Sequence, residues 1–159
     1  MSESLIKLIN CSKTEQYESL IQQLTALVEN EKDMIANMAN ISAAIKEIFE
    51  FLWVGFYIVR GEQLVLGPFQ GPIACTRIAF GRGVCGTAWQ QARTLIVPDV
   101  ESFPGHIACS SLSKSEIVVP LVHHDQVWAI LDIDSCDRAQ FDDVDASYLE
   151  KIVKLVSRE

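Results

Sequence analysis

The sequence lacks three features that would point to a partner or a compartment: basic clusters, long apolar runs and an N-terminal leader. Its 13 Lys and Arg residues stand singly against 21 acidic residues, and the formal net charge is −8. Binding of nucleic acid or of an anionic membrane relies on clustered Lys and Arg, so neither is expected as a partner. Apolar runs such as Ile117–Val122 are far shorter than the roughly 20 residues of a membrane span. The start of the chain lacks the segments of a signal peptide, and a cytoplasmic protein is expected.

The sequence also lacks the closely spaced cysteine pairs of a structural zinc site. Five cysteines are present, but none forms a CxxC pair, and structural zinc ligands usually come in such pairs. His106, His123 and His124 show no ligand-like pattern, so neither a metal nor another cofactor is expected. In a reducing cytosol, five cysteines do not form a permanent disulfide framework. Redox chemistry fits better, because it needs an attacking thiolate, a resolving thiol and loop mobility.

The pattern of apolar residues predicts helices at both ends of the chain and strands between them. The length of 159 residues is that of one ordinary domain, so residues 1–159 are expected to form a single domain. Helical spacing covers residues 13–29, 33–51 and 142–157, with Asp142 as the N-cap of the last helix. Strands are expected within 51–69, 76–80 and 95–100, and a hairpin at 115–135 with its turn at 123–126. This order predicts an α+β fold, in which an antiparallel sheet carries the terminal helices on one face.

Three of the cysteines stand beside residues that favour turns. Cys75, Cys85 and Cys109 have small or turn-forming neighbours, and a short helix is expected to begin just after Cys85. Loops of this kind are where scaffolds carry function. Cys11 and Cys136 have nothing reactive near them in the sequence and are expected to be small core residues, the usual environment of a free cysteine.

Two acidic residues share a predicted strand with apolar residues. Alternation along residues 127–135 places Trp128, Ile130, Asp132 and Asp134 on one face. One interpretation is a strand end that frays into solvent. The other is a pocket that binds a cation or holds a carboxyl group with a raised pKa. Such a pocket would be completed by Glu116 on the partner strand and walled by aromatic residues of an earlier strand, whose usual role is core packing: Trp53, Phe56 and Tyr57.

At these residues the sequence resembles the free methionine-R-sulfoxide reductases, single-domain members of the GAF-fold superfamily. The motifs that carry the resemblance occur in order over residues 53–135: WVGFY, LGPFQG, IACTRI, GRGVCG, VPDV, FPGHIAC, SEIVVPL and LDIDS. The FDDVD–YLE tail also fits. The resemblance implies a GAF-type antiparallel sheet flanked by helices, and reduction of free rather than peptide-bound methionine-R-sulfoxide with thioredoxin as the usual reductant. It also suggests a homodimer.

The resemblance further implies roles for individual residues. Attack on the substrate sulfur would fall to Cys109 and resolution to Cys75, with Cys85 as a second resolving or relay thiol. The residues alone leave this order open, because a helix beginning after Cys85 would lower its pKa and make it the rival attacking thiol. Substrate contacts are implied at Trp53, Tyr57, Glu116, Asp132 and Asp134.

An alternative function is that of a non-catalytic GAF-type domain that binds or senses a small molecule such as an amino acid. A binder would need the acids but not the thiols, whereas the redox cycle needs Cys75 and Cys109 to bond. The Cα atoms of a bonded pair lie within about 7 Å of each other. We therefore expect the three cysteines to cluster at one end of the sheet, beside Asp132 and Asp134.

Overall fold

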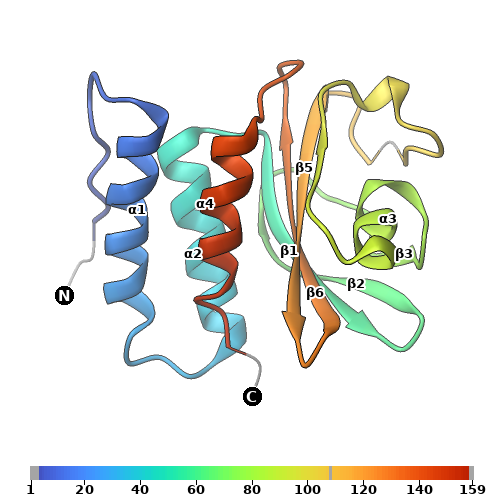
Figure 1. The fold of residues 1–159 in the computed structure, drawn as a ribbon, viewed down its shortest axis with the longest axis horizontal. Helices are drawn as coiled ribbons and strands as arrows, with labels where there is room; N and C mark the ends of the chain where they lie inside the picture. The colour runs from blue at the N-terminus through green and yellow to red at the C-terminus, as the bar shows by residue number, and fades with distance from the viewer. Residues whose placement is uncertain (1–3, 108, 158–159) are drawn as a thin grey trace.

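The computed structural model describes residues 4–107 and 109–157, which form a sheet with helices on both faces (Figure 1). Helices α1, α2 and α4 lie together on one face, and α3 lies on the other. The helices are α1 Lys13–Val28, α2 Met34–Phe49, α3 Gly83–Gln91 and α4 Asp143–Val153, with a short 3-10 helix at Val100–Ser102. No helix within the described residues is long and apolar enough to cross a membrane.

The described strands form one antiparallel sheet in the order β3-β2-β1-β6-β5-β4. They are β1 Trp53–Arg60, β2 Gln63–Gln70, β3 Arg77–Ala79, β4 Leu95–Val97, β5 Ser115–His123 and β6 Gln126–Ser135. The predicted hairpin at 115–135 is confirmed, and its turn residues His124 and Asp125 both have positive φ, as a two-residue hairpin turn of type I′ requires. The predicted α+β fold, with the terminal helices on one face of the sheet, is confirmed.

Side chains just before α1, α2 and α4 accept hydrogen bonds from the first backbone N–H groups, which have no partner within a helix. Ser12 and Glu15 form a reciprocal capping box at the start of α1. Asp142 accepts hydrogen bonds from the backbone of Val144 and Asp145 at the start of α4, so its prediction as an N-cap is confirmed. Caps of this kind each stabilise a helix by about 1 kcal/mol.

The sheet separates two apolar clusters, and successive strand residues alternate between them except at a bulge in β6. The cluster beneath α1, α2 and α4 takes Val54, Phe56, Ile117, Val119, Leu131 and Ile133 from the sheet. The cluster beneath α3 takes Trp53, Tyr57, Val118 and Ile130. The prediction that Phe56 joins Trp53 and Tyr57 in one wall is wrong, because neighbouring residues of a strand point to opposite faces.

One strand residue lies on the face opposite to the one predicted. Trp128 packs in the helix-side cluster, whereas Ile130 packs beneath α3. The register between β5 and β6 explains this: Leu121 pairs with Ala129 but Val122 pairs with Val127, so Trp128 is an extra residue on β6. A β-bulge of this kind breaks the simple alternation of side chains. Beyond the bulge, towards Asp132 and Asp134, the predicted alternation holds.

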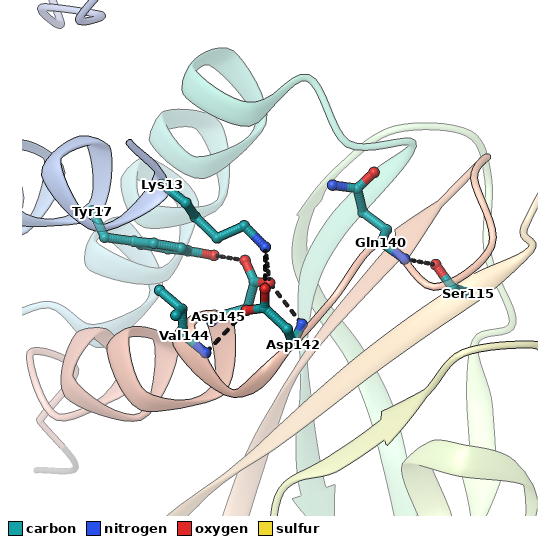
Figure 2. A network of polar contacts seen from close by, with 7 residues as sticks. All are labelled: Lys13, Tyr17, Ser115, Gln140, Asp142, Val144 and Asp145. Carbon is teal, nitrogen blue, oxygen red and sulfur yellow. Dashed lines mark hydrogen bonds and ion pairs between the residues drawn. The ribbon is translucent and has the colours of Figure 1, made fainter. Parts of the chain in front are cut away.

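A buried carboxylate joins the first helix to the last one (Figure 2). Asp145 on α4 is 1% exposed. It accepts a hydrogen bond from the Tyr17 hydroxyl at 2.6 Å and from Lys13 Nζ at 2.7 Å, both on α1. It also accepts from the backbone N–H of Asp142 at 2.9 Å. Helix α1 is therefore held to α4 by a polar contact as well as by apolar packing.

The two cysteines expected in the core are not buried. Cys136 is exposed, because it follows the end of β6 where the chain leaves the sheet. Cys11 is partly exposed and donates a hydrogen bond to Gln16 Oε1 at 3.2 Å. The prediction of core positions for these thiols is wrong.

Candidate active site

A cavity lies on the α3 side of the sheet, where β1, β5 and β6 run beneath two loops. Its floor consists of strand residues and the first turn of α3, and its rim comes from loop residues 72–74, 106, 107, 109 and 110. The predicted site residues that line it are Trp53, Tyr57, Cys85, Cys109, Glu116, Asp132 and Asp134. Cys75 joins them through a disulfide to Cys109. The fold thus brings together residues that are up to 81 positions apart, counting from Trp53 to Asp134.

The register of the strands places the carboxyl groups side by side. Glu116 on β5 is directly opposite Asp134 on β6, and Asp132 is two residues further along the same face. Trp53 on β1 is opposite Asp134 on the other side of β6. The acids and the indole ring therefore belong to one continuous surface of three neighbouring strands.

Burial sets the protonation of these carboxyl groups. Glu116 is 5% exposed and Asp132 is 6% exposed. Burial, and then the charges of the neighbouring acids, raise the pKa of Glu116 and of Asp134 well above the ordinary range. The pKa of Asp132 is also raised by burial. Ser113 donates a hydrogen bond to Asp134 Oδ1 at 2.6 Å, which acts in the opposite direction on Asp134.

Cys85 does not occupy the loop that its neighbours predicted. Helix α3 begins at Gly83, so Cys85 lies in its first turn, 5% exposed, and its Sγ donates to Glu116 Oε1 at 3.7 Å. Gly86 allows this placement, because a Cβ there would lie 2.5 Å from the carbonyl oxygen of Ala79 on β3. Burial and the nearby acids raise the pKa of the Cys85 thiol. The expectation of a pKa lowered by the helix is wrong, since desolvation and negative charge outweigh the helix dipole.

The other two pocket thiols form a disulfide at the rim of the cavity. The Cα atoms of Cys75 and Cys109 are 5.8 Å apart, within the expected limit of about 7 Å. Cys109 is exposed and Cys75 is half-buried, so a reductant in solution has access to the bond. The predicted proximity of these two thiols is present in the structure.

Two aromatic side chains of β1 tie the Cys75 loop to the cavity floor. The Tyr57 hydroxyl donates to the carbonyl oxygen of Cys75 at 2.9 Å, and Trp53 Nε1 donates to that of Pro72 at 3.0 Å. The rings of Trp53 and Tyr57 stack with centroids 5.9 Å apart. They shape an apolar wall beside the acids and fix the position of the loop that carries Cys75.

The structure also places Arg82, His106 and Ser113 in the lining of the cavity, polar residues for which no site role was expected. His106 Nε2 lies 4.0 Å from Glu116 Oε2, and burial lowers the pKa of its imidazole. Each of the three lies in or beside a motif that carries a pocket cysteine or acid: GRGVCG, FPGHIAC or SEIVVPL. Their proximity in sequence to these motifs was the signal that could have identified them as cavity residues.

The chain is similar to known proteins along most of its length. The GAF domain profile matches residues 33–159. The GAF domain-containing protein A of Dictyostelium discoideum is 62% identical, over 91% of this chain and 92% of its own length. The free methionine-R-sulfoxide reductase of Saccharomyces cerevisiae is 42% identical, over 94% of this chain and 88% of its own. The crystal structure of the free methionine-R-sulfoxide reductase of Neisseria meningitidis in complex with its substrate matches with a TM-score of 0.91. The two sequences are 49% identical, and the match covers 96% of this chain and 93% of the other chain.

Proposed function

Because the chain belongs to the GAF-domain family of free methionine-R-sulfoxide reductases, we propose that it reduces free L-methionine-R-sulfoxide to L-methionine. It is an oxidoreductase, and residues 1–159 act in this proposal as one catalytic domain. The observation that carries the proposal is the Cys75–Cys109 pair at the rim of a cavity floored by carboxyl groups. A binding domain would use the acids but would have no need of a thiol pair at the entrance.

The acids recognise the α-ammonium group that distinguishes a free amino acid from a residue in a peptide. Glu116, Asp132 and Asp134 present oxygens on one face of the sheet. An ammonium group provides hydrogen bonds and positive charge for these buried oxygens, whereas an acylated amine leaves them without a charge partner. Unpaired buried polar groups are a strong basis for rejection of the wrong ligand. Trp53 and Tyr57 then contact the S-methyl end of the substrate.

The chemical step transfers the sulfoxide oxygen to a cysteine. The Cys109 thiolate attacks the substrate sulfur, a carboxyl group of the cavity protonates the sulfoxide oxygen, and methionine leaves as Cys109 becomes a sulfenic acid. Cys75 then attacks the sulfenic sulfur, water departs and the disulfide forms. An external dithiol reopens the disulfide. The sum is methionine sulfoxide plus dithiol giving methionine, disulfide and water.

The raised pKa values suit the acids to this role. A carboxyl group donates a proton at neutral pH only if its pKa is held above the ordinary range. Burial does this for Glu116 and Asp134. We assign the proton to this coupled group of acids, and we assign Cys85 to a second resolving or relay role beneath the Cys109 loop.

The remaining assignments concern the setting of the enzyme. The reductant is a dithiol protein of the thioredoxin class, which reaches the exposed Cys109 side of the disulfide. Its use implies a reducing compartment, the cytoplasm. A homodimer is the proposed assembly.

The test compares free L-methionine-R-sulfoxide with its N-acetylated form in an assay of NADPH consumption with thioredoxin and thioredoxin reductase. We expect turnover of the free amino acid and almost none of the acetylated form. Comparable rates on both would refute recognition through the ammonium group. Binding of free methionine sulfoxide without turnover would instead support the binding domain as the function.

A further inference from the structure

A potential metal-ligand cluster lies in the floor of the cavity, although the sequence spacing of the cysteines predicted none. The Cys85 sulfur, a Glu116 oxygen and an Asp132 oxygen all lie within 4.8 Å of one another. All three residues are more than nine-tenths buried. Closely spaced ligands can be recognised along the sequence, whereas these residues come from α3, β5 and β6 and come together only in the folded protein.

A second observation is a buried oxygen in this cluster that lacks a hydrogen-bond partner among the described residues. Asp132 Oδ1 is buried, and no described residue donates a hydrogen bond to it. Buried polar oxygens are normally satisfied, and each exception calls for an explanation. Among the described residues, Arg82 and His106 are the only basic groups that line the cavity, against three acids and the Cys85 thiol.

The spacing is close to that of a tetrahedral zinc site. Metal–sulfur and metal–oxygen distances of about 2.3 and 2.0–2.2 Å place sulfur and oxygen ligands roughly 3.5 Å apart. The Cys85 Sγ to Glu116 Oε1 distance is already 3.7 Å, and the other separations in the cluster are no more than 4.8 Å. His106 Nε2, at 4.0 Å from Glu116 Oε2, offers a nitrogen ligand on the same side.

The ligand types select the class of cation. A thiolate favours Zn²⁺ or Co²⁺ over Mg²⁺ or Ca²⁺, which prefer oxygen ligands alone. Binding requires that Cys85 lose its proton, and the charge of a bound dication favours the thiolate form that burial among acids disfavours.

We propose that Cys85, Glu116 and Asp132 bind a divalent transition metal of the Zn²⁺ type, and that this cation competes with the substrate ammonium group for the same carboxyl groups. The competition rests on the proposed function, whereas the metal site itself does not. The metal is then a reversible inhibitor that occupies the carboxyl groups to which the substrate binds.

The experiment titrates Co²⁺ into the oxidised protein, in which Cys75 and Cys109 are bonded and Cys85 is the only pocket thiol. Cobalt reports a thiolate ligand through a near-ultraviolet charge-transfer band, and tetrahedral geometry through intense visible bands. We expect saturation at one cobalt per chain, displacement by Zn²⁺, and no charge-transfer band in Cys85→Ser. Asp132→Asn should weaken binding at least about tenfold. The matched control is Cys136→Ser, which removes an exposed thiol outside the cavity and should keep the band.

Circular dichroism verifies that each variant is folded. If a variant does not fold, the wild-type titration still tests whether the metal site exists. Absence of the band in the wild-type protein, or its persistence in folded Cys85→Ser, would overturn the metal site. Free methionine sulfoxide should displace cobalt from the oxidised protein, which cannot turn the ligand over, whereas the N-acetylated form should not. Equal displacement by both, or by neither, would overturn the competition. Lack of turnover with an intact cobalt band would count against the proposed function and leave the metal site standing.

Discussion

The contact between α1 and α4 is open to a quantitative test, because α1 lies outside the GAF match at 33–159 yet packs on its core. The perturbations are Tyr17→Phe, which removes one donor and keeps the ring, and Asp145→Asn, which removes the charge and keeps the shape. Tyr17 is fully buried, and burial together with the Asp145 charge raises the pKa of its hydroxyl, so the hydroxyl stays protonated and donates.

The magnitudes follow from the hydrogen bonds and the charge that each substitution removes. Tyr17→Phe removes one hydrogen bond to a charged acceptor, worth about 1.5–3 kcal/mol of the free energy of unfolding. Asp145→Asn leaves Lys13 Nζ and the Asp142 N–H facing an amide. Removing one partner of a buried pair costs about 3–5 kcal/mol, and we expect the lower end because Lys13 is about one-third exposed.

The assay is urea unfolding of the two variants and of the double variant, with the wild-type protein as reference. The double-mutant cycle should give a coupling between the two side chains of at least about 0.5 kcal/mol. Glu18→Gln is the matched control: Glu18 accepts a hydrogen bond from Tyr148 and joins the same two helices, but at an exposed position, where such contacts contribute little. Activity per folded molecule should be unchanged, because the contact lies on the opposite face of the sheet from the cavity.

A destabilisation below about 0.5 kcal/mol for Tyr17→Phe would refute this reasoning, since it would place the hydroxyl in contact with water rather than in a desolvated bond. An equal destabilisation for Glu18→Gln would refute it as well. The stability would then come from general helix packing and not from the buried carboxylate.

Two further predictions concern the cavity. Cys109→Ser should form no methionine in a single turnover, whereas Cys75→Ser should form one equivalent and then stall; one equivalent from Cys109→Ser, measured by rapid quench, would move the attack to Cys85. Burial raises the pKa of Glu116, so the native state retains a proton that the unfolded chain releases. The resulting contribution to the free energy of unfolding is fully present below about pH 4, and it is lost as the pH rises through the raised pKa. Glu116→Gln should therefore flatten the decline of the free energy of unfolding with pH by up to about 1.4 kcal/mol per pH unit, and an unchanged slope in urea titrations would contradict the raised pKa.

Local signals predicted the parts of the fold that depend on local chemistry. Asp142 caps its helix as expected, and the hairpin turns where His124 and Asp125 stand between apolar strands. The alternation near Asp132 and Asp134 also placed both acids on one face correctly. These features need only the geometry of a few neighbouring residues.

The failures occurred where neighbouring strands or burial decided the outcome. The bulge that turns Trp128 to the other face depends on the register with β5, which no pattern within one strand reveals. The pKa of Cys85 depends on acids that are 31 and 47 residues away in sequence, and their charge outweighs the helix start. The expected position of Cys85 beside the acids is present in the structure. The spacing of Cys85, Glu116 and Asp132 as a possible ligand set was not predicted, because its members come from three different elements.

In the proposed cycle, the disulfide at the cavity rim closes a covalent loop in the chain when it forms and opens that loop when it is reduced. The bond closes a loop over a sequence separation of 34, which contains β3, α3 and β4. In the chain-entropy treatment, closing a loop of this length stabilises the folded state by about 4 kcal/mol. In the proposed cycle, each sulfoxide reduced therefore leaves the protein harder to unfold, and each visit of the reductant returns it to the less stable open chain. The thermal stability of the protein then depends on the ratio of its disulfide-bonded to its reduced form, which is set by the concentrations of methionine sulfoxide and of the dithiol reductant.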